Sequence, residues 1–349
     1  MAVYHTGLGR EGPGLLLRDI RAGAADVLVV RDALLALRPD AVLLLDLDFD
    51  LDRRVLSALS ALLADGGHPM HHTFAPRPNT GRHTGLDMDG DGRLGTPDDA
   101  QGYGEFSGAG GMALLSRFPI DRHSLVDFSD ILWRDLPGSR QPVVAGLPFP
   151  SIETQAVQRL STTNHWEVAL QTPGGPLTVM AWHAGPPAFG GPHGRNRARN
   201  ADETAFWLWR LQGGLAPVPR DFVLMGGANL DPEAGDGHHA TMRTLLAHPL
   251  LQDPAPETVA EAGRPASRTT ARWENRDLAL RVEYLLPSVS LRVLESGLIW
   301  PSESARHALV WADVVLPDVR ANSVPSSGPS DRAPEHQTRR NGKSASRSP

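Results

Sequence analysis

Acidic side chains recur at short intervals in one stretch of the chain, Asp87-Met88-Asp89-Gly90-Asp91-Gly92-Arg93-Leu94-Gly95-Thr96-Pro97-Asp98. Asp87, Asp89, Asp91 and Asp98 stand at positions 1, 3, 5 and 12 of an EF-hand calcium loop, with Asp instead of the usual Glu at 12. Alternate carboxylates and a turn-forming glycine let a short loop wrap a cation that prefers oxygen ligands. Neither flank has the pattern of a long helix, so we expect an isolated Ca²⁺ loop. The alternative is an Asp- and Gly-rich surface loop without an ion.

A second set of polar residues lies at the ends of apolar runs. Asp46 ends one such run, His183 ends another, and His307 directly precedes a third. Carboxylates are ligands for hard cations, and imidazoles can transfer protons near pH 7. These residue types can therefore hold a cation and transfer protons.

The apolar runs that position these residues alternate with helical patterns, which predicts an α/β or α+β protein in layers. The runs expected to be strands are 41–46, 112–116, 166–170, 177–183, 222–225, 282–286, 291–294 and 309–316. The segments with helical spacing are 27–37, 55–63, 202–211 and 241–247. Three stretches, 77–111, 130–154 and 253–277, are expected to be irregular. From residue 317 bulky apolar residues nearly vanish, which predicts a disordered tail over 317–349.

The composition limits the function classes. The chain has 349 residues, of which 40% are hydrophobic, and its formal net charge is −6. An acidic chain lacks the basic coat of a protein that binds long DNA without sequence preference. With no cysteine, disulfides and thiolate metal sites are impossible. No secretory signal and no apolar run near the roughly 20 residues of a membrane span are visible, so we expect a soluble, cytoplasmic protein.

The ordered motifs resemble the endonuclease/exonuclease/phosphatase superfamily, in a bacterial branch, over residues 1–316. The motifs that carry the resemblance are Tyr4-His5-Thr6, Gly12-Pro13-Gly14-Leu15-Leu16-Leu17-Arg18-Asp19-Ile20, Asp46-Leu47-Asp48-Phe49-Asp50, Gly111–Ile120, Trp182-His183, Gly226–Pro232, Arg281-Val282-Glu283-Tyr284 and Arg306-His307. The resemblance implies two packed mixed β-sheets flanked by helices, the DNase I-like sandwich. It also implies hydrolysis of a phosphate ester with Mg²⁺ or Mn²⁺.

The resemblance assigns a role to each polar residue at the strand ends. Asp46 is at the position of the metal-binding acid, where Glu is usual. His183 and His307 match the strand-end histidine and the C-terminal catalytic histidine, and Glu283 matches the acid that orients the latter. Asn229 matches the amide of the G-D-x-N motif, which contacts the phosphate or the attacking water. His5 is a further site candidate, where Asn is usual, and His165 is a weaker one.

Three positions depart from the family pattern. The motif G-D-x-N is Gly226-Gly227-Ala228-Asn229 here, so Gly227 replaces the aspartate that orients the attacking water. Gly7 stands where an acidic residue is common, and Arg306 replaces the Asp that often precedes the last histidine. Loss of a positioned general base costs about 10²–10⁴-fold in rate. We therefore expect a weak phosphoester hydrolase of the nuclease or phosphatase type.

Two other functions remain open at this point. One is a pseudoenzyme that keeps the groove as a binding surface, and the other is a structural or interaction protein stabilised by calcium. The substrate of an enzyme could be DNA, RNA, a nucleotide or a phosphoinositide-like headgroup. We expect a monomer with no membrane partner. Arg195, Arg197 and Arg199 either contact a phosphate or belong to a solvated loop.

Overall fold

The structure is a computed structural model that describes residues 1–258 and 266–317. Met1–Pro317 forms one compact unit. The tail expected over 317–349 lies outside the described residues from 318 onward. None of the helices in the described part of the chain is long and apolar enough to span a membrane.

The first sheet has six strands in the order β14-β15-β1-β2-β4-β3. Their bounds are β1 Ala2–His5, β2 Ala41–Leu47, β3 His72–Phe74, β4 Gly111–Ser116, β14 Arg292–Ile299 and β15 Leu309–Val315. β1 is parallel to β2 and antiparallel to β15, while β2 is antiparallel to β4. Both ends of the described chain therefore contribute to one sheet.

The second sheet has five strands in the order β13-β10-β9-β8-β5. Their bounds are β5 Ile120–Asp127, β8 His165–Thr172, β9 Gly175–His183, β10 Phe222–Gly227 and β13 Glu283–Pro287. β9 is parallel to β10, and β13 is antiparallel to β10. Apolar residues in the strands of both sheets alternate between two buried faces, as expected when each sheet is covered on both sides.

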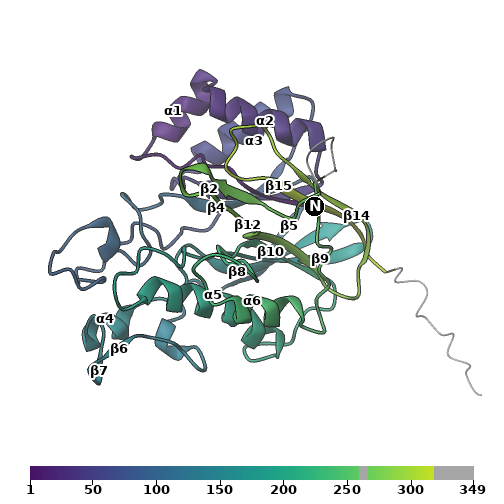
Figure 1. The fold of residues 1–349 in the computed structure, drawn as a ribbon. Coiled ribbons are helices and arrows are strands. Elements are labelled where there is room, and N and C mark those ends of the chain that lie inside the picture. Colours follow the sequence, from purple (N-terminus) through teal and green to yellow (C-terminus); the bar gives the residue numbers. More distant parts are fainter. Residues whose placement is uncertain (259–265, 318–349) are drawn as a thin grey trace, which may run out of the picture. The chain divides into compact units, whose positions relative to one another are not determined.

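Helices cover the outer face of each sheet, so the molecule has four layers (Figure 1). α1 Leu15–Ala22, α2 Ala25–Leu37 and α3 Arg54–Asp65 pack on the first sheet, and α5 Arg195–Leu211 and α6 His239–Leu246 pack on the second. Three apolar clusters fill the spaces between the layers, and the central one joins the two sheets. These features confirm the two packed mixed sheets flanked by helices, which is the DNase I-like architecture.

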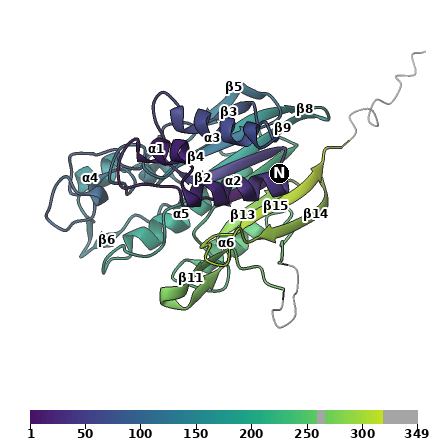
Figure 2. The same ribbon diagram turned by 90° about the horizontal axis from the view of Figure 1, so that it is seen from above.

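Small elements decorate the loops. They are η1 Pro97–Asp99, η2 Trp133–Asp135, β6 Val143–Val144, β7 Leu147–Pro148, α4 Ile152–Val157, β11 Ala271–Trp273, η3 Glu274–Arg276 and β12 Leu278–Leu280. β11 and β12 pair into an antiparallel ribbon. In Figure 2 β11 lies at one side of the molecule, while α4 and β6 lie at another.

The structure agrees with the expected strands and helices in type and differs from them at several bounds. The strand expected over 291–294 is longer, because β14 extends to Ile299. The helix expected over 202–211 begins earlier, at Arg195. The pattern did not predict β5, α1 or the β11–β12 ribbon, since these elements are short or half-exposed.

Candidate active site

The ends of six strands meet at one edge of the two sheets. β1 and β2 run parallel and end there at His5 and beyond Asp46, and β9 and β10 end there at His183 and Gly227. β13 and β15 are antiparallel to their neighbours, so they begin at this edge. The pairing Gly227 with Glu283 and Gly227 with His183 places these residues on adjacent strands. Motifs that are far apart in the sequence therefore lie close together at this edge.

Three imidazoles form a packed group, which we call the histidine cluster: His5, His183 and His307. The rings of His5 and His307 are stacked with centroids 3.9 Å apart and planes 9° from parallel. His183 meets His5 edge-on at 5.3 Å. The structure therefore brings His183 and His307 together around the His5 ring.

Glu283 orients the last histidine of the cluster. Its Oε1 lies 2.7 Å from His307 Nδ1, and both residues are buried. A carboxylate on one ring nitrogen fixes the tautomer, because the hydrogen-bonded nitrogen must carry the proton. Nε2 is then the nitrogen that can take up a proton from a reacting group.

Burial keeps the other two imidazoles neutral at physiological pH. Burial, with a smaller contribution from the nearby His307, lowers the pKa of His183 to about 4. The pKa of His5 is also well below its ordinary range, and burial is the largest cause. The nearby His307, His183 and Arg306 act in the same direction with smaller effects. The Nδ1 atoms of both rings are buried and have no hydrogen-bond partner in the described structure. Unpaired buried polar atoms in such a place call for a water, an ion or a ligand group.

Asp46 lies at the border of the histidine cluster with a strained backbone. Its φ is 55°, in the left-handed region, and a bulge interrupts the pairing of β2 with β4 there. The carboxylate packs between Gly9 and Gly110: a Cβ on either glycine would lie 2.6 or 2.8 Å from Oδ1. Burial raises the pKa of Asp46, although the Gly9 amide and His307 oppose the shift.

Asp48 is a second buried acid that the sequence interpretation did not include. Its two carboxylate oxygens accept the backbone N–H groups of Arg10 and Gly110, each at 3.0 Å. Burial raises its pKa to about 6, and Asp46 contributes in the same direction. Its sequence signal was a second acid two residues after Asp46, at the end of the same apolar run. Asp48 joins the loop after β1 to the loop before β4.

Asn229 extends the site from the end of β10. Its φ is 47°, a conformation that Asn adopts more readily than most residues. Its Nδ2 donates to the carbonyl of Ala184 at 2.7 Å, one residue beyond His183. This bond ties the Asn229 turn to the His183 loop.

The departures from the family pattern differ in their structural consequences. Gly7 has a φ of 64° and open space around it. At Gly227 a Cβ would lie 2.9 Å from both His183 Cδ2 and Leu45 Cδ1, so the space of a side chain is filled. Arg306 is exposed, and its backbone carbonyl accepts the N–H of Arg272 at 2.8 Å.

The cluster offers few ligands to a Mg²⁺ ion. Among residues 1–258 and 266–317, the one group of three or more His, Asp or Glu side chains whose ligand atoms all lie within 4.8 Å of one another is elsewhere. Here Asp46 supplies one carboxylate, while that of Glu283 is bonded to His307. Since Mg²⁺ is often held by one or two carboxylates, waters and substrate phosphates, the site fits an ion shared with substrate. It does not fit an ion enclosed by protein ligands.

The converging acidic group lies in the loop with calcium-type spacing. It consists of Asp87, Asp89 and Asp99. Asp99 was not expected in it, and the expected Asp91 and Asp98 are exposed and lie outside it. Asp87 accepts the N–H groups of Gly90, Asp91 and Gly92, whereas Asp99 caps η1 and accepts the Met88 N–H. The turn at η1 brings residue 99 inward in place of residue 98.

Other candidates from the sequence have structural roles. His165 is buried, with Nε2 bonded to the carbonyl of Glu203 and Nδ1 to Ser161. Arg195 and Arg199 are buried in α5, so the solvated-loop interpretation was wrong for both. Trp273, which the sequence interpretation missed, meets His307 edge-on at 5.9 Å. Its only sequence signal was its aromatic type, which is not specific.

Comparison with known proteins supplies the family. The model of the Endonuclease/Exonuclease/phosphatase family matches residues 14–331. No curated protein matches the sequence. Among solved structures, an endonuclease/exonuclease/phosphatase from Beutenbergia cavernae DSM 12333 is 18% identical with a TM-score of 0.52, covering 90% of this chain and 71% of that one.

A second similar structure is an endonuclease/exonuclease/phosphatase family protein from Leptotrichia buccalis C-1013-b. It is 12% identical with a TM-score of 0.53, and the match covers 90% of this chain and 98% of that one. At these identities the two structures support the fold, while the family model rests on the sequence itself. The chain belongs to the Endonuclease/Exonuclease/phosphatase family.

Proposed function

We propose that the protein is a phosphoester hydrolase of low turnover whose reaction takes place at the histidine cluster. The observation that carries the proposal is the bond of 2.7 Å between Glu283 Oε1 and His307 Nδ1, at the sheet edge where the strand ends meet. A carboxylate–imidazole pair is suited to proton transfer, because the carboxylate stabilises the imidazolium that forms. In this proposal His307 Nε2 exchanges a proton with the attacking water or the leaving oxygen.

His183 lies beside residue 227, where the family pattern has an aspartate and this chain has Gly227. Its Nε2 lies 3.4 Å from the position of a Cβ on Gly227, and its neutral ring can accept a hydrogen bond from water. However, a base with a pKa of about 4 is weak at pH 7, since catalytic bases work best with a pKa near the operating pH. This mismatch supports low turnover.

Asp46 would be the acidic ligand of the Mg²⁺ or Mn²⁺ ion expected for this class. Such an ion, when bound, polarises the phosphoryl oxygen and offsets the charge on the leaving oxygen. Asn229 would orient the phosphate or the water through its side-chain oxygen, because its Nδ2 is engaged by Ala184. In this proposal the substrate is a phosphate ester, a class that includes nucleic acids and nucleotides.

A hydrolysis screen tests this function. Phosphomonoesters and phosphodiesters with a chromogenic leaving group are incubated with the protein and Mg²⁺, Mn²⁺ or EDTA, with His307→Ala as the control. We expect slow hydrolysis that the variant lacks. Equal rates for the two proteins would assign any activity to a contaminant and remove the proposal.

The pseudoenzyme is the second candidate. The observation in its favour is that His183 and Leu45 fill the space beside Gly227, so an acid cannot be restored there by a side-chain change alone. A folded protein without hydrolysis that still binds phosphate would favour this function.

We further propose that the loop of residues 87–99 binds Ca²⁺ through Asp87, Asp89 and Asp99. The support is that one oxygen from each carboxylate lies within 4.8 Å of the others. Three carboxylates this close repel one another, and burial together with Asp91 raises the pKa of Asp89. A divalent cation would relieve the repulsion and hold the loop in place.

A further inference from the structure

We propose that Arg306 is a phosphate-binding residue that supplies fixed positive charge beside the histidine cluster. The inference rests on the proposed phosphoester site and adds a residue for which the family pattern has an acid. It concerns how a phosphoryl group is held, and it does not require a metal ion.

The backbone of Arg306 is fixed on both sides. Its carbonyl accepts the N–H of Arg272, the next residue forms a bridge with Ala271, and the N–H of Ala308 donates to Thr270 at 2.7 Å. The segment 306–308 is therefore held against the start of β11. Because the backbone of Arg306 is already fixed, less conformational entropy is lost when its side chain binds a ligand.

The guanidinium of Arg306 has no partner among the described residues. Neither a hydrogen bond nor an ion pair involves its side chain in residues 1–258 and 266–317, and the residue is exposed. By contrast, the buried Arg281 is bonded twice to Asp253, and the buried Arg210 is bonded twice to Glu167. Arg306 keeps its donors available for a ligand from solvent.

The charge of Arg306 reaches the site. It lowers the pKa of both His5 and Asp46, although burial has the largest effect on each. His183 and His307 are only 8% and 7% exposed, whereas Arg306, the residue directly before His307, is exposed. Arg306 is therefore a solvent-accessible positive charge next in sequence to the proposed catalytic histidine.

Relative to the family pattern, this site has lost negative charge and gained a positive one, which suits an anionic ligand. Gly7 and Gly227 supply no carboxylate, and Arg306 carries a positive charge where the family often has a negative one. A guanidinium presents several N–H donors in one plane, which matches two oxygens of a phosphate. An arginine also keeps its charge at every physiological pH.

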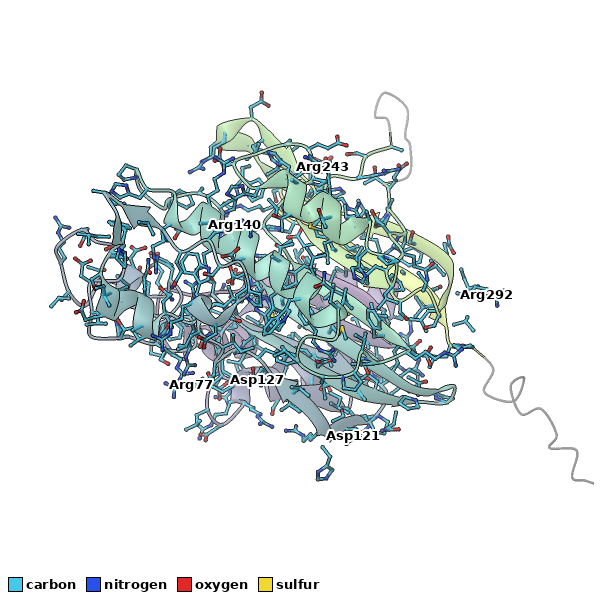
Figure 3. All side chains as sticks on the ribbon, turned by 90° about the horizontal axis from the view of Figure 1, so that it is seen from below. Arg77, Asp121, Asp127, Arg140, Arg243 and Arg292 are labelled. Atoms are coloured by element: carbon cyan, nitrogen blue, oxygen red, sulfur yellow. The ribbon has the colours of Figure 1, made fainter. Side chains whose placement is uncertain are left out.

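The experiment measures binding of inorganic phosphate in buffer with EDTA, by thermal denaturation at constant ionic strength and by calorimetry. The proteins are the wild type, Arg306→Gln, Arg306→Lys and Arg292→Gln as the matched control. Arg292 is exposed and pairs with Val315, at the end of β15 far from His307, and Figure 3 shows it on the edge strand. We expect Arg306→Gln to weaken binding by about tenfold or more, as the loss of a charge-assisted hydrogen bond does.

Arg306→Lys keeps the charge and loses the planar fork, so we expect an intermediate affinity. Arg292→Gln should bind as the wild type does. If the wild type does not bind phosphate in EDTA, or if Arg306→Gln binds it as tightly as the wild type, the inference is wrong. Should Arg306→Gln fail to fold, Arg306→Lys decides: wild-type affinity in that variant contradicts the role of the guanidinium fork.

The two proposals fail in different ways. Phosphate binding that depends on Arg306, in a protein without hydrolysis, would support the inference and remove the proposed enzyme function. Hydrolysis that needs His307, in a protein whose phosphate affinity is the same with Arg306→Gln, would do the reverse.

Discussion

The imidazole of His183 lies in the space that a side chain at residue 227 would need. A Cβ on Gly227 would be 2.9 Å from His183 Cδ2, and Leu45 Cδ1 is equally near. The φ of Gly227 is not in the left-handed region, so space, and not backbone conformation, restricts this position. Restoring the family aspartate here therefore requires a change at His183 as well.

We predict that Gly227→Asp and Gly227→Ala each lower the free energy of unfolding by about 1–3 kcal/mol, because both overpack this space. In the background His183→Ala the cost should fall, since one of the two contacts is gone. Urea denaturation of the wild type, Gly227→Ala, His183→Ala and the double variant forms a double-mutant cycle that measures the coupling, expected at about 0.5–3 kcal/mol. Additive effects would mean that His183 does not occupy the space.

The Glu283–His307 pair predicts that substitution of His307 lowers the rate of hydrolysis more than substitution of Glu283 does. His307→Ala should reduce the rate about 10²–10⁴-fold, because a positioned acid or base is lost. Glu283→Gln should reduce it about 10–100-fold, because the ring is less well oriented and less basic. The exposed Glu295 on β14 gives the control Glu295→Gln, which should retain the wild-type rate. Rates on one chromogenic phosphodiester decide, and an unchanged rate in Glu283→Gln would contradict the pairing role.

Ca²⁺ should stabilise protein that has been treated with a chelator. At a hundredfold excess over the dissociation constant the gain is about 2.7 kcal/mol, which raises the melting temperature. Asp89→Asn should reduce the shift, whereas Asp91→Asn, outside the converging group, should keep it. Loss of the shift in both variants would support the ligand set expected from the loop spacing. No shift in the wild type would remove the calcium proposal.

The raised pKa of Asp48 predicts that the free energy of unfolding falls as pH rises. Burial raises its folded-state pKa from 3.8 to about 6, so its protonated form is favoured in the folded protein. The stabilisation is complete below about pH 4 and is lost as pH rises through about 6, with a size of at most about 3 kcal/mol. Glu203, whose pKa burial raises to about 7, acts in the same direction.

Asp48→Asn should therefore flatten the fall in unfolding free energy between pH 4 and 7, measured by urea denaturation at several pH values. The exposed Asp52 supplies the control Asp52→Asn, which should leave the slope unchanged. A slope in Asp48→Asn equal to that of the wild type would show that Asp48 does not titrate in this range.

The sequence predicted the class of fold, and it singled out residues that the fold brings together at one sheet edge. Apolar runs such as 41–46 and 177–183 end in polar residues, and this pattern holds whatever the partners of the strands are. His183, His307 and Glu283 could be proposed from the order of motifs, since order along the chain survives large changes in sequence. The spacing of the acids in 87–98 likewise pointed to the loop in which three carboxylates converge.

Only the tertiary structure decided how these residues meet. The 3.9 Å stack of His5 on His307 joins the end of β1 to the start of β15, and no local pattern encodes a contact between strands so distant in sequence. The exchange of Asp98 for Asp99 depends on the turn at η1, because adjacent residues point in different directions. The filled space at Gly227 depends on two side chains from other strands. Residue types and their order are fixed by the sequence. The space around a side chain, its burial and the charges near it depend on how the chain packs.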